Sequence, residues 1–232
     1  MNTNQKPLFR HELKYLISTA QLKMLENRLN HLMPLDKHVR ETGIYNIRSL
    51  YFDDYNNRCY YENEDGTDPR EKFRIRIYNH STDKISLECK RKEHGKIYKT
   101  SCPLTIEQTK SLMKGQYLRD VAEQPELLQK FTYLMMTRRF KPVVVVEYDR
   151  VPYIYKLGNV RVTLDQNISA SKAVDKFLEE EMPKRPIMTK GQQLLEVKYD
   201  ELLPDYIYTN LQLKDLRQTM FSKYYLCRKF TL

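Results

Sequence analysis

Several short segments of this chain alternate apolar side chains with Arg, Lys or Glu. Because successive side chains of a β-strand point to opposite faces, each such segment would have one apolar face and one charged face. The pairs that share a charged face are Glu12 with Lys14, Arg74 with Arg76, Glu88 with Lys90, and Glu196 with Lys198. Guanidinium groups bind phosphate oxygens in a planar, bidentate way and ammonium groups act as point charges. These rows could therefore hold a phosphate chain.

An open sheet with its charged face in water is the simpler account of each strand taken alone. A solvent-facing row would also contain Ser, Thr, Gln and Asn, however, whereas these rows repeat charged residues. If the sheet curls into a barrel with its apolar faces outward, the charges line a closed bore. Desolvation and repulsion would oppose an empty bore, so an anion and a metal ion would have to occupy the space. The pattern therefore favours a tunnel for a polyanion.

About eight strands and four helices would position these rows. The strand segments are residues 11–16, 47–52, 73–78, 85–92, 96–102, 143–150, 160–165 and 194–200. Capping boxes at Ser18–Gln21 and Thr105–Gln108 each predict the start of a helix, and Gly115 predicts the end of the second. Amphipathic spacing predicts two further helices, over residues 126–136 and 209–220.

Composition limits the classes of protein to which this chain can belong. It has 232 residues and a formal net charge of +10, which favours anionic ligands, and 41% of its residues are hydrophobic, which is enough for a packed core. We expect a single domain over residues 1–232. No apolar run is long enough for a membrane helix and no secretory signal is present, so we expect a cytoplasmic protein. The four cysteines lack metal-ligand spacing, which indicates reduced structural thiols.

The charged segments resemble a known family, the VTC-type polyphosphate polymerase domain of the triphosphate tunnel metalloenzyme (CYTH-like) group. The matching segments, in the family's order, are RHELKY (10–15), SLYFD (49–53), FRIR (73–76), LECKRK (87–92), YDR (148–150), RVTLD (161–165), LEVKY (195–199) and FSKY (221–224). The resemblance implies an α+β fold: an antiparallel eight-stranded tunnel β-barrel with a charged interior and helices packed outside. It also implies a divalent metal, Mn²⁺ or Mg²⁺, and a nucleoside triphosphate or polyphosphate within the basic bore.

The resemblance also assigns roles to individual residues. The implied phosphate ligands are Lys14, Arg74, Arg76, Lys90, Lys99, Arg150, Arg161 and Lys223, of which Lys14, Arg74, Arg76 and Lys223 would be catalytic. The implied metal ligand is Glu196, and Tyr148 and Ser222 are flanking phosphate contacts. The alternation of side chains between the two faces of a strand, which we call strand parity, adds Lys198 as a phosphate contact and Glu12 and Glu88 as metal ligands. Parity does not support Lys99, because Lys96, Tyr98 and Thr100 alternate against it, so a bulge would be required.

The preferred activity is transfer of the terminal phosphoryl group of a nucleoside triphosphate to a polyphosphate chain. Tunnel triphosphatases commonly open with Glu-x-Glu-x-Lys, whereas Arg10, Glu12 and Lys14 occupy those positions here. Hydrolysis needs carboxylates to hold metal and orient water, so the missing carboxylate favours transfer.

Two alternatives stay open: a tunnel triphosphatase or polyphosphatase, and a non-enzymatic module that binds a polyanion or nucleic acid. The interleaved carboxylates Glu12, Glu88 and Glu196 would repel a nucleic-acid backbone, which disfavours nucleic acid as a partner. A partner protein in a membrane is also left open, because the chain itself carries no membrane segment.

Overall fold

The computed structural model describes residues 9–39 and 41–232. The strands are β1 (His11–Ser18), β2 (Tyr45–Asp53), β3 (Arg70–Tyr78), β4 (Ser81–Glu93), β5 (Lys96–Leu104), β6 (Lys141–Tyr155), β7 (Val160–Ser171), β8 (Arg185–Pro186) and β9 (Gln192–Tyr199). The helices are α1 (Thr19–Leu32), α2 (Arg58–Glu64), α3 (Ile106–Met113), α4 (Glu126–Arg138), α5 (Asp205–Leu211) and α6 (Lys223–Lys229). None of the helices within these residues is long and apolar enough to span a membrane.

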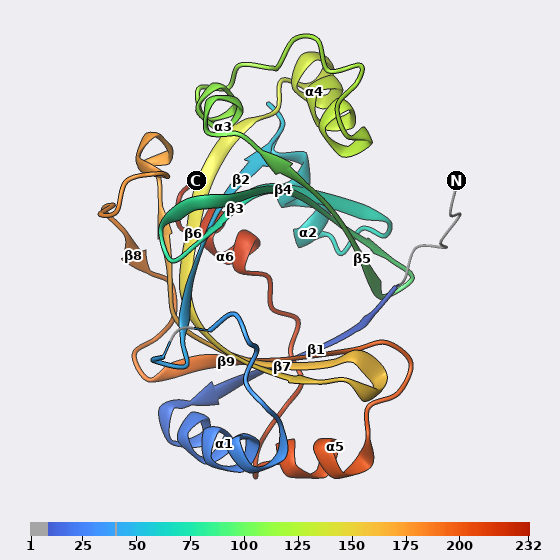
Figure 1. The fold of residues 1–232 in the computed structure, drawn as a ribbon, viewed down its shortest axis with the longest axis vertical. Helices are drawn as coiled ribbons and strands as arrows, with labels where there is room; N and C mark the ends of the chain where they lie inside the picture. The colour runs from blue at the N-terminus through green and yellow to red at the C-terminus, as the bar shows by residue number, and fades with distance from the viewer. Residues whose placement is uncertain (1–8, 40) are drawn as a thin grey trace.

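The strands form one antiparallel sheet that curls on itself (Figure 1). Its order is β1-β9-β7-β6-β2-β3-β4-β5, and the short β8 pairs with β7. The first and last strands of this order meet at an isolated bridge, in which Arg10 and Ile97 exchange two backbone hydrogen bonds of 2.9 and 3.1 Å. The predicted antiparallel eight-stranded tunnel barrel is therefore confirmed as a curled sheet with helices packed on its outer face.

Apolar side chains on the outer face of the sheet explain where the helices lie. In β3, Phe73, Ile75 and Ile77 are no more than 1% exposed, and Phe73 packs against Phe131 of α4 with ring centroids 5.4 Å apart. Helices α3 and α4 cover this part of the sheet, while α1 and α5 lie against the opposite part, over β1, β9 and β7 (Figure 1). Burial of these two apolar layers stabilises the curl and leaves its concave face to the charged residues.

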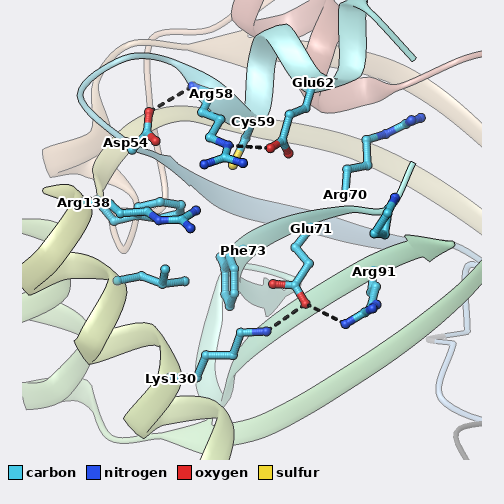
Figure 2. A pocket seen from close by; sticks show the side chains of 13 residues that line it. Asp54, Arg58, Cys59, Glu62, Arg70, Glu71, Phe73, Arg91, Lys130 and Arg138 are labelled. Atoms are coloured by element: carbon cyan, nitrogen blue, oxygen red, sulfur yellow. Dashed lines mark hydrogen bonds and ion pairs between the residues drawn. The ribbon is translucent and has the colours of Figure 1, made fainter. Parts of the chain in front are cut away.

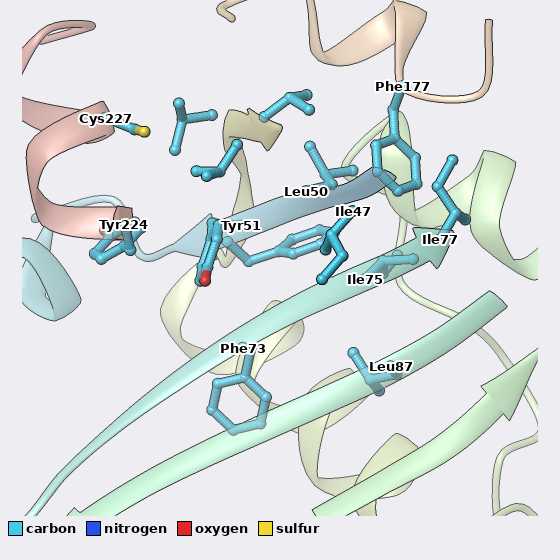
Figure 3. Packing of buried hydrophobic residues seen from close by; sticks show 14 of the residues in the cluster. Ile47, Leu50, Tyr51, Phe73, Ile75, Ile77, Leu87, Phe177, Tyr224 and Cys227 are labelled. Atoms are coloured by element: carbon cyan, nitrogen blue, oxygen red, sulfur yellow. The ribbon is translucent and has the colours of Figure 1, made fainter. Parts of the chain in front are cut away.

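Helix α6 lies within the curl, where it contacts β6, β7 and α2 (Figure 1). Its Tyr224 ring is 5.0 Å from the ring of Tyr51 in β2, and the two residues belong to the larger hydrophobic cluster (Figure 3). The Tyr224 hydroxyl donates to Asp53 Oδ2 at 2.5 Å. These contacts fix the start of α6, and with it Lys223, on the concave side of the sheet.

The predicted capping boxes are confirmed at both helices. The Ser18 hydroxyl accepts from the Gln21 amide and the Gln21 side chain accepts from the Ser18 amide, and Thr105 and Gln108 do the same for α3. Gly115 follows α3 with a φ of +72°, a conformation that glycine adopts without steric penalty. The four cysteines are free and buried, as expected.

The predicted helix over residues 209–220 is wrong. Helix α5 begins at Asp205 after Pro204 and ends at Leu211. The chain then runs beside β1, where the Thr219 amide donates to the Lys14 carbonyl at 2.8 Å and Gln218 bridges Tyr15. Pairing with β1 therefore overrides the helical spacing.

Sequence reasoning also missed α2 and α6. Helix α2 follows Asn57, which has a φ of +54° and makes no side-chain cap. Its first amide, of Arg58, donates to Asp54 Oδ1 at 2.9 Å, and the next two donate to the carboxylate of Asp53, from Cys59 at 2.8 Å and from Tyr60 at 3.1 Å. Both helices are short and depend on tertiary contacts, which periodicity does not reveal.

Candidate functional site

The charged rows lie on the concave face of the curled sheet, which we call the bore. In β3, Arg74 stands opposite Tyr51 of β2 and opposite Glu88 of β4. Directly opposed residues of neighbouring strands share a face, so these side chains lie together in the bore. Arg76 follows on the same face, opposite Ser49, and is 7% exposed. The predicted alternation of β3 is confirmed.

Three cations surround the buried carboxylate of Glu88. Arg74 donates to Glu88 Oε2 from Nε at 2.8 Å and from Nη2 at 2.7 Å, and Lys99 Nζ donates to Oε1 at 2.9 Å. Arg76 Nη1 lies 3.7 Å from Oε2. Burial alone would raise the pKa of Glu88, but Arg76, Arg74 and Lys99 outweigh it and hold this pKa well below its ordinary value. Glu88 is therefore ionised and already neutralised by cations.

Lys99 lies in the bore, and no bulge is needed to place it there. The register of β4 and β5 is continuous and sets Lys99 opposite Lys90. Thr100 and Cys102 instead point to the outer face, where Cys102 joins the hydrophobic cluster. The parity argument was wrong because β5 is an edge strand with polar residues on both faces, so residue type does not identify its buried side.

A second carboxylate, Glu12, is held by lysines from three strands. Lys198, its direct partner on β9, has Nζ 3.3 Å from Glu12 Oε1, and Lys14 Nζ lies 3.4 Å from Oε2. Lys90 Nζ reaches from β4 and donates to both carboxylate oxygens, at 3.1 and 2.8 Å. Burial opposes ionisation of Glu12, but Lys14, Lys90 and Lys198 together lower its pKa to about 2.

Lys90 itself has an unusual protonation equilibrium. Burial lowers the pKa of Lys90 to about 7, because the attraction of Glu12 offsets only part of the desolvation and of the repulsion from Lys14 and Lys198. A polyanion in the bore would add negative charge beside this amine, and would therefore favour its protonated form.

Lys223, from the first turn of α6, joins two carboxylates on neighbouring strands. Its Nζ lies 2.6 Å from Asp165 Oδ2 and 3.5 Å from Glu196 Oε2. Arg150 binds the same Asp165 in a bidentate way, with bonds of 2.6 and 2.8 Å. Burial would lower the pKa of Lys223, but Asp165 and Glu196 outweigh it and raise this pKa above its ordinary value. Lys223 is thus a permanent positive charge in the bore.

Tyr148 lies between these cations. Its ring centroid is 4.7 Å from Lys223 Nζ and 5.2 Å from the Arg150 guanidinium carbon, and Arg76 Nη2 donates to its hydroxyl at 3.4 Å. Burial would raise the pKa of Tyr148, but Arg150, Arg76 and Lys223 outweigh it and lower this pKa. The hydroxyl is therefore oriented by cations and is placed to donate to an anion.

Two predicted residues occupy the margin of this group. Arg161 forms an ion pair with Asp36, which follows α1, and the Arg161 side chain is 35% exposed. Ser222 caps α6: its hydroxyl accepts from the Tyr225 amide at 3.3 Å and from Lys72 Nζ at 3.0 Å. The Ser222 hydroxyl therefore already has two donors, and its predicted phosphate contact stays a prediction.

Sequence reasoning missed Lys72 and Asp165. Lys72 is on the bore face of β3, opposite Lys90, and among the described residues it has no carboxylate partner: its Nζ contacts Asn63 and Ser222. Lys72 lies two residues before Arg74, so strand parity would have assigned both side chains to the same face. Asp165 shares the parity of Arg161, and its bidentate bond to Arg150 shows that it positions a cation.

The carboxylates fit a metal ion only if phosphate oxygens complete its coordination. Within the described residues, no group of three or more His, Cys, Asp or Glu side chains is placed to hold a metal ion. Glu12 and Glu196 share Lys198 as an ion-pair partner, whereas Glu88 binds a different set of cations. Mg²⁺ is often held by one or two carboxylates with substrate phosphates, and Glu12 and Glu196 fit that mode once the lysines paired with them turn to the phosphates.

Comparison with protein families identifies the fold that presents these residues. The model of the VTC domain matches residues 9–232, which covers the whole sheet and every charged row of the bore. The chain belongs to the VTC domain family. The predicted family is thereby confirmed. No curated protein sequence matches this VTC domain significantly.

Solved structures that resemble this VTC domain are distant in sequence. An adenylyl cyclase candidate from Hippeastrum, described as having a dominant triphosphatase activity, superposes with a TM-score of 0.57 at 14% identity, covering 97% of each chain. A protein from Pyrococcus horikoshii gives a TM-score of 0.47 at 13% identity, covering 91% of this VTC domain and 94% of that chain. The first of these likenesses supports the fold of this VTC domain.

Proposed function

We propose that this VTC domain is a metal-dependent phosphotransferase that acts on nucleoside triphosphate and polyphosphate in its bore. The observation that carries the proposal is the convergence of cations from six strands and α6 on one concave face. Lys14, Arg74, Lys90, Arg150 and Lys223 all lie there, paired with only a few carboxylates. This excess of positive charge suits a ligand with closely spaced negative charges, such as a phosphate chain.

The proposed reaction transfers the terminal phosphoryl group of a nucleoside triphosphate to the end of a phosphate chain. The bond from the terminal phosphorus to its bridging oxygen breaks, an oxygen of the chain end bonds to that phosphorus, and nucleoside diphosphate leaves. The attacking oxygen is already anionic, so no general base is required. Charge on the non-bridging oxygens would be stabilised by positioned cations, which supply most of the catalysis of phosphoryl transfer.

Each group of the bore has a part in this proposal. Arg74, Arg76 and Arg150 would clamp phosphate oxygens, Lys14 and Lys223 would add point charges, and Tyr148 would donate a hydrogen bond. The further phosphate contacts are proposed to be Lys90, Lys99, Arg161, Lys198 and Ser222. A divalent metal held by Glu196 and Glu12 would supply charge neutralisation between neighbouring phosphates.

The segment around Arg10 supports transfer over hydrolysis. Arg10 stands where a triphosphatase would have another carboxylate, and its Nε pairs with Asp200 at 2.8 Å. The carboxylates near the proposed metal are therefore Glu12 and Glu196, without a third on β1. Fewer carboxylates mean fewer groups to hold metal and orient a water molecule.

A chain-length assay tests the proposal. The protein would be incubated with ATP and Mn²⁺, and polyphosphate length would be read on gels beside free phosphate release. We expect long chains with little free phosphate, and Lys223→Gln should abolish chain formation. Free phosphate without chains would establish hydrolysis instead. If neither product forms, the protein binds polyanions without catalysing a reaction.

Hydrolysis is the second candidate because the Hippeastrum protein of similar fold is described as having a dominant triphosphatase activity. The same assay separates the two reactions, since both start from ATP and differ in the acceptor of the phosphoryl group.

A further inference from the structure

A second group of cations lines a cleft outside the bore, between α2 and α4 (Figure 2). The cleft has a volume of about 310 Å³. Its cations are Arg58, Arg70, Arg91, Lys130 and Arg138. Its carboxylates are Asp54, Glu62 and Glu71, so the lining carries a net positive charge.

Two of these guanidinium groups lack a carboxylate partner. Glu71 accepts from Lys130 at 2.8 Å and lies 3.8 Å from Arg91, and Glu62 accepts from Arg58 at 2.7 Å. Among the described residues, no carboxylate lies within 4.0 Å of a nitrogen of Arg138 or Arg70. The cleft therefore holds cationic groups whose charge is not neutralised by the protein.

The floor of the cleft is apolar. Phe73 and Phe140 are 1% and 4% exposed, and their ring centroids are 5.9 Å apart in an edge arrangement. A concave site with charge of one sign above a low-dielectric floor focuses the field on a bound counter-ion. Since the two rings are covered by each other and by the helices, they offer no free face on which a nucleotide base could stack.

We propose that this outer cleft is a second anion site, which binds a short phosphate chain independently of the bore. Arg58 on α2 and Arg138 on α4 both line the cleft (Figure 2), so guanidinium forks from two helices would hold the chain. The volume is at the lower end of the range for small-ligand pockets, which suits an anion with two or three phosphate groups. Inorganic polyphosphate and the phosphate tail of a nucleotide share this chemistry.

Calorimetry with inorganic tripolyphosphate tests the site in a protein whose bore is disabled. The background is Arg74→Ala, Arg76→Ala and Glu88→Gln, which removes two bore cations together with the carboxylate that they neutralise. Tripolyphosphate should still bind this background. Adding Arg58→Gln and Arg138→Gln should weaken the remaining binding at least about tenfold, because each loses charge-assisted hydrogen bonds.

The matched control adds Lys172→Gln and Lys214→Gln, which remove the same charge from exposed positions elsewhere, and it should change affinity less than about twofold. Equal loss in the control and the cleft variant would overturn the proposal, as would the absence of any binding in the background. A comparison of affinities for ATP and tripolyphosphate then identifies the ligand. Equal affinities indicate that the site binds the phosphate tail of a nucleotide, and a lower affinity for ATP indicates that it binds inorganic chains.

If the bore does not bind triphosphate, the result is different. The variant with the altered bore would then bind tripolyphosphate with the same stoichiometry as the wild-type protein. If the background does not fold, amide shifts of α2 and α4 in the wild-type protein give the same answer. Tripolyphosphate must then move those signals, and Arg58→Gln with Arg138→Gln must abolish the movement.

Discussion

Replacing Arg74 and Arg76 together with Ala tests both the stability and the chemistry of the bore. The change removes two hydrogen bonds of 2.8 and 2.7 Å from Arg74 to Glu88, and the weaker contact of Arg76 at 3.7 Å. Glu88, which is 3% exposed, would keep only Lys99. Repulsion between cations in an empty bore, taken alone, predicts unchanged or raised stability, but the ion pairs with Glu88 reverse that expectation.

The loss of stability follows from leaving a buried carboxylate without its main partners. Removing one side of a buried ion pair typically lowers the free energy of unfolding by about 3–5 kcal/mol, and Lys99 should keep the loss near the lower value. The folded-state pKa of Glu88 is depressed below 4.5, so its contribution is present above about pH 4.5 and is lost as the pH falls toward the folded value. The difference between wild type and variant should shrink in acid over that window.

Adding Glu88→Gln to the double variant removes the unpaired charge and should restore about 1–3 kcal/mol of the loss. Urea unfolding of the wild-type, double-variant and triple-variant proteins at pH 7 measures these differences. Calorimetric titration with tripolyphosphate then measures binding in the triple variant. We expect affinity at the bore to fall at least about a hundredfold, because two guanidinium groups lose charge-assisted hydrogen bonds of about 1.5–3 kcal/mol each. A stable triple variant with wild-type stoichiometry and affinity would refute the assignment of the bore as the triphosphate site.

Three further predictions address single groups. Glu196→Gln should raise the Mn²⁺ concentration needed for half-maximal tripolyphosphate binding about tenfold, since it deletes one charge with little change of shape; an unchanged titration would mean that other groups hold the metal. Binding of tripolyphosphate at pH 8 should take up a proton at Lys90, whose pKa is about 7; calorimetry in two buffers of different ionisation enthalpy measures this uptake, which Lys90→Arg should remove. Ser18→Ala should lower the free energy of unfolding by about 1 kcal/mol in urea without changing tripolyphosphate binding, because it deletes the cap of α1.

Strand parity predicted most of the fold and much of the bore. It worked best where one face of a strand is packed under a helix, as in β3, where Phe73 and Ile75 identify the outer face and so assign Arg74 to the inner one. It failed for Lys99, because the edge strand β5 carries polar residues on both faces. Parity also carries no information about distance across the bore. That Lys90 reaches Glu12 on β1 became known only from the structure.

The elements that sequence reasoning missed depend on contacts from outside their own segment. Helix α2 depends on Asp53 for two of its first hydrogen bonds, and residues 212–222 follow β1 instead of continuing a helix. Strand β1 is remote in sequence from residues 212–222, and Asp53 lies outside α2 at the end of β2, so the spacing within each segment records neither partner. The role of Asp165 as the partner of Arg150 and Lys223 was likewise hidden, although its parity was visible.

The pairing of the two ends of the chain has a consequence for how the protein folds. Strand β1 is hydrogen-bonded to β9, with Lys14 opposite Glu196, and the chain beyond α5 lies along the other edge of β1. These contacts join residues far apart in sequence, and such topologies fold slowly because the entropy of closing a long loop is lost before the non-local contacts form. During synthesis, β1 must wait for its partners until β9 and Gln218 have left the ribosome, and Lys223 follows them. A nascent chain that ends before Lys223 lacks the cation that joins Asp165 and Glu196, so the charged site is complete only after α6 has been made.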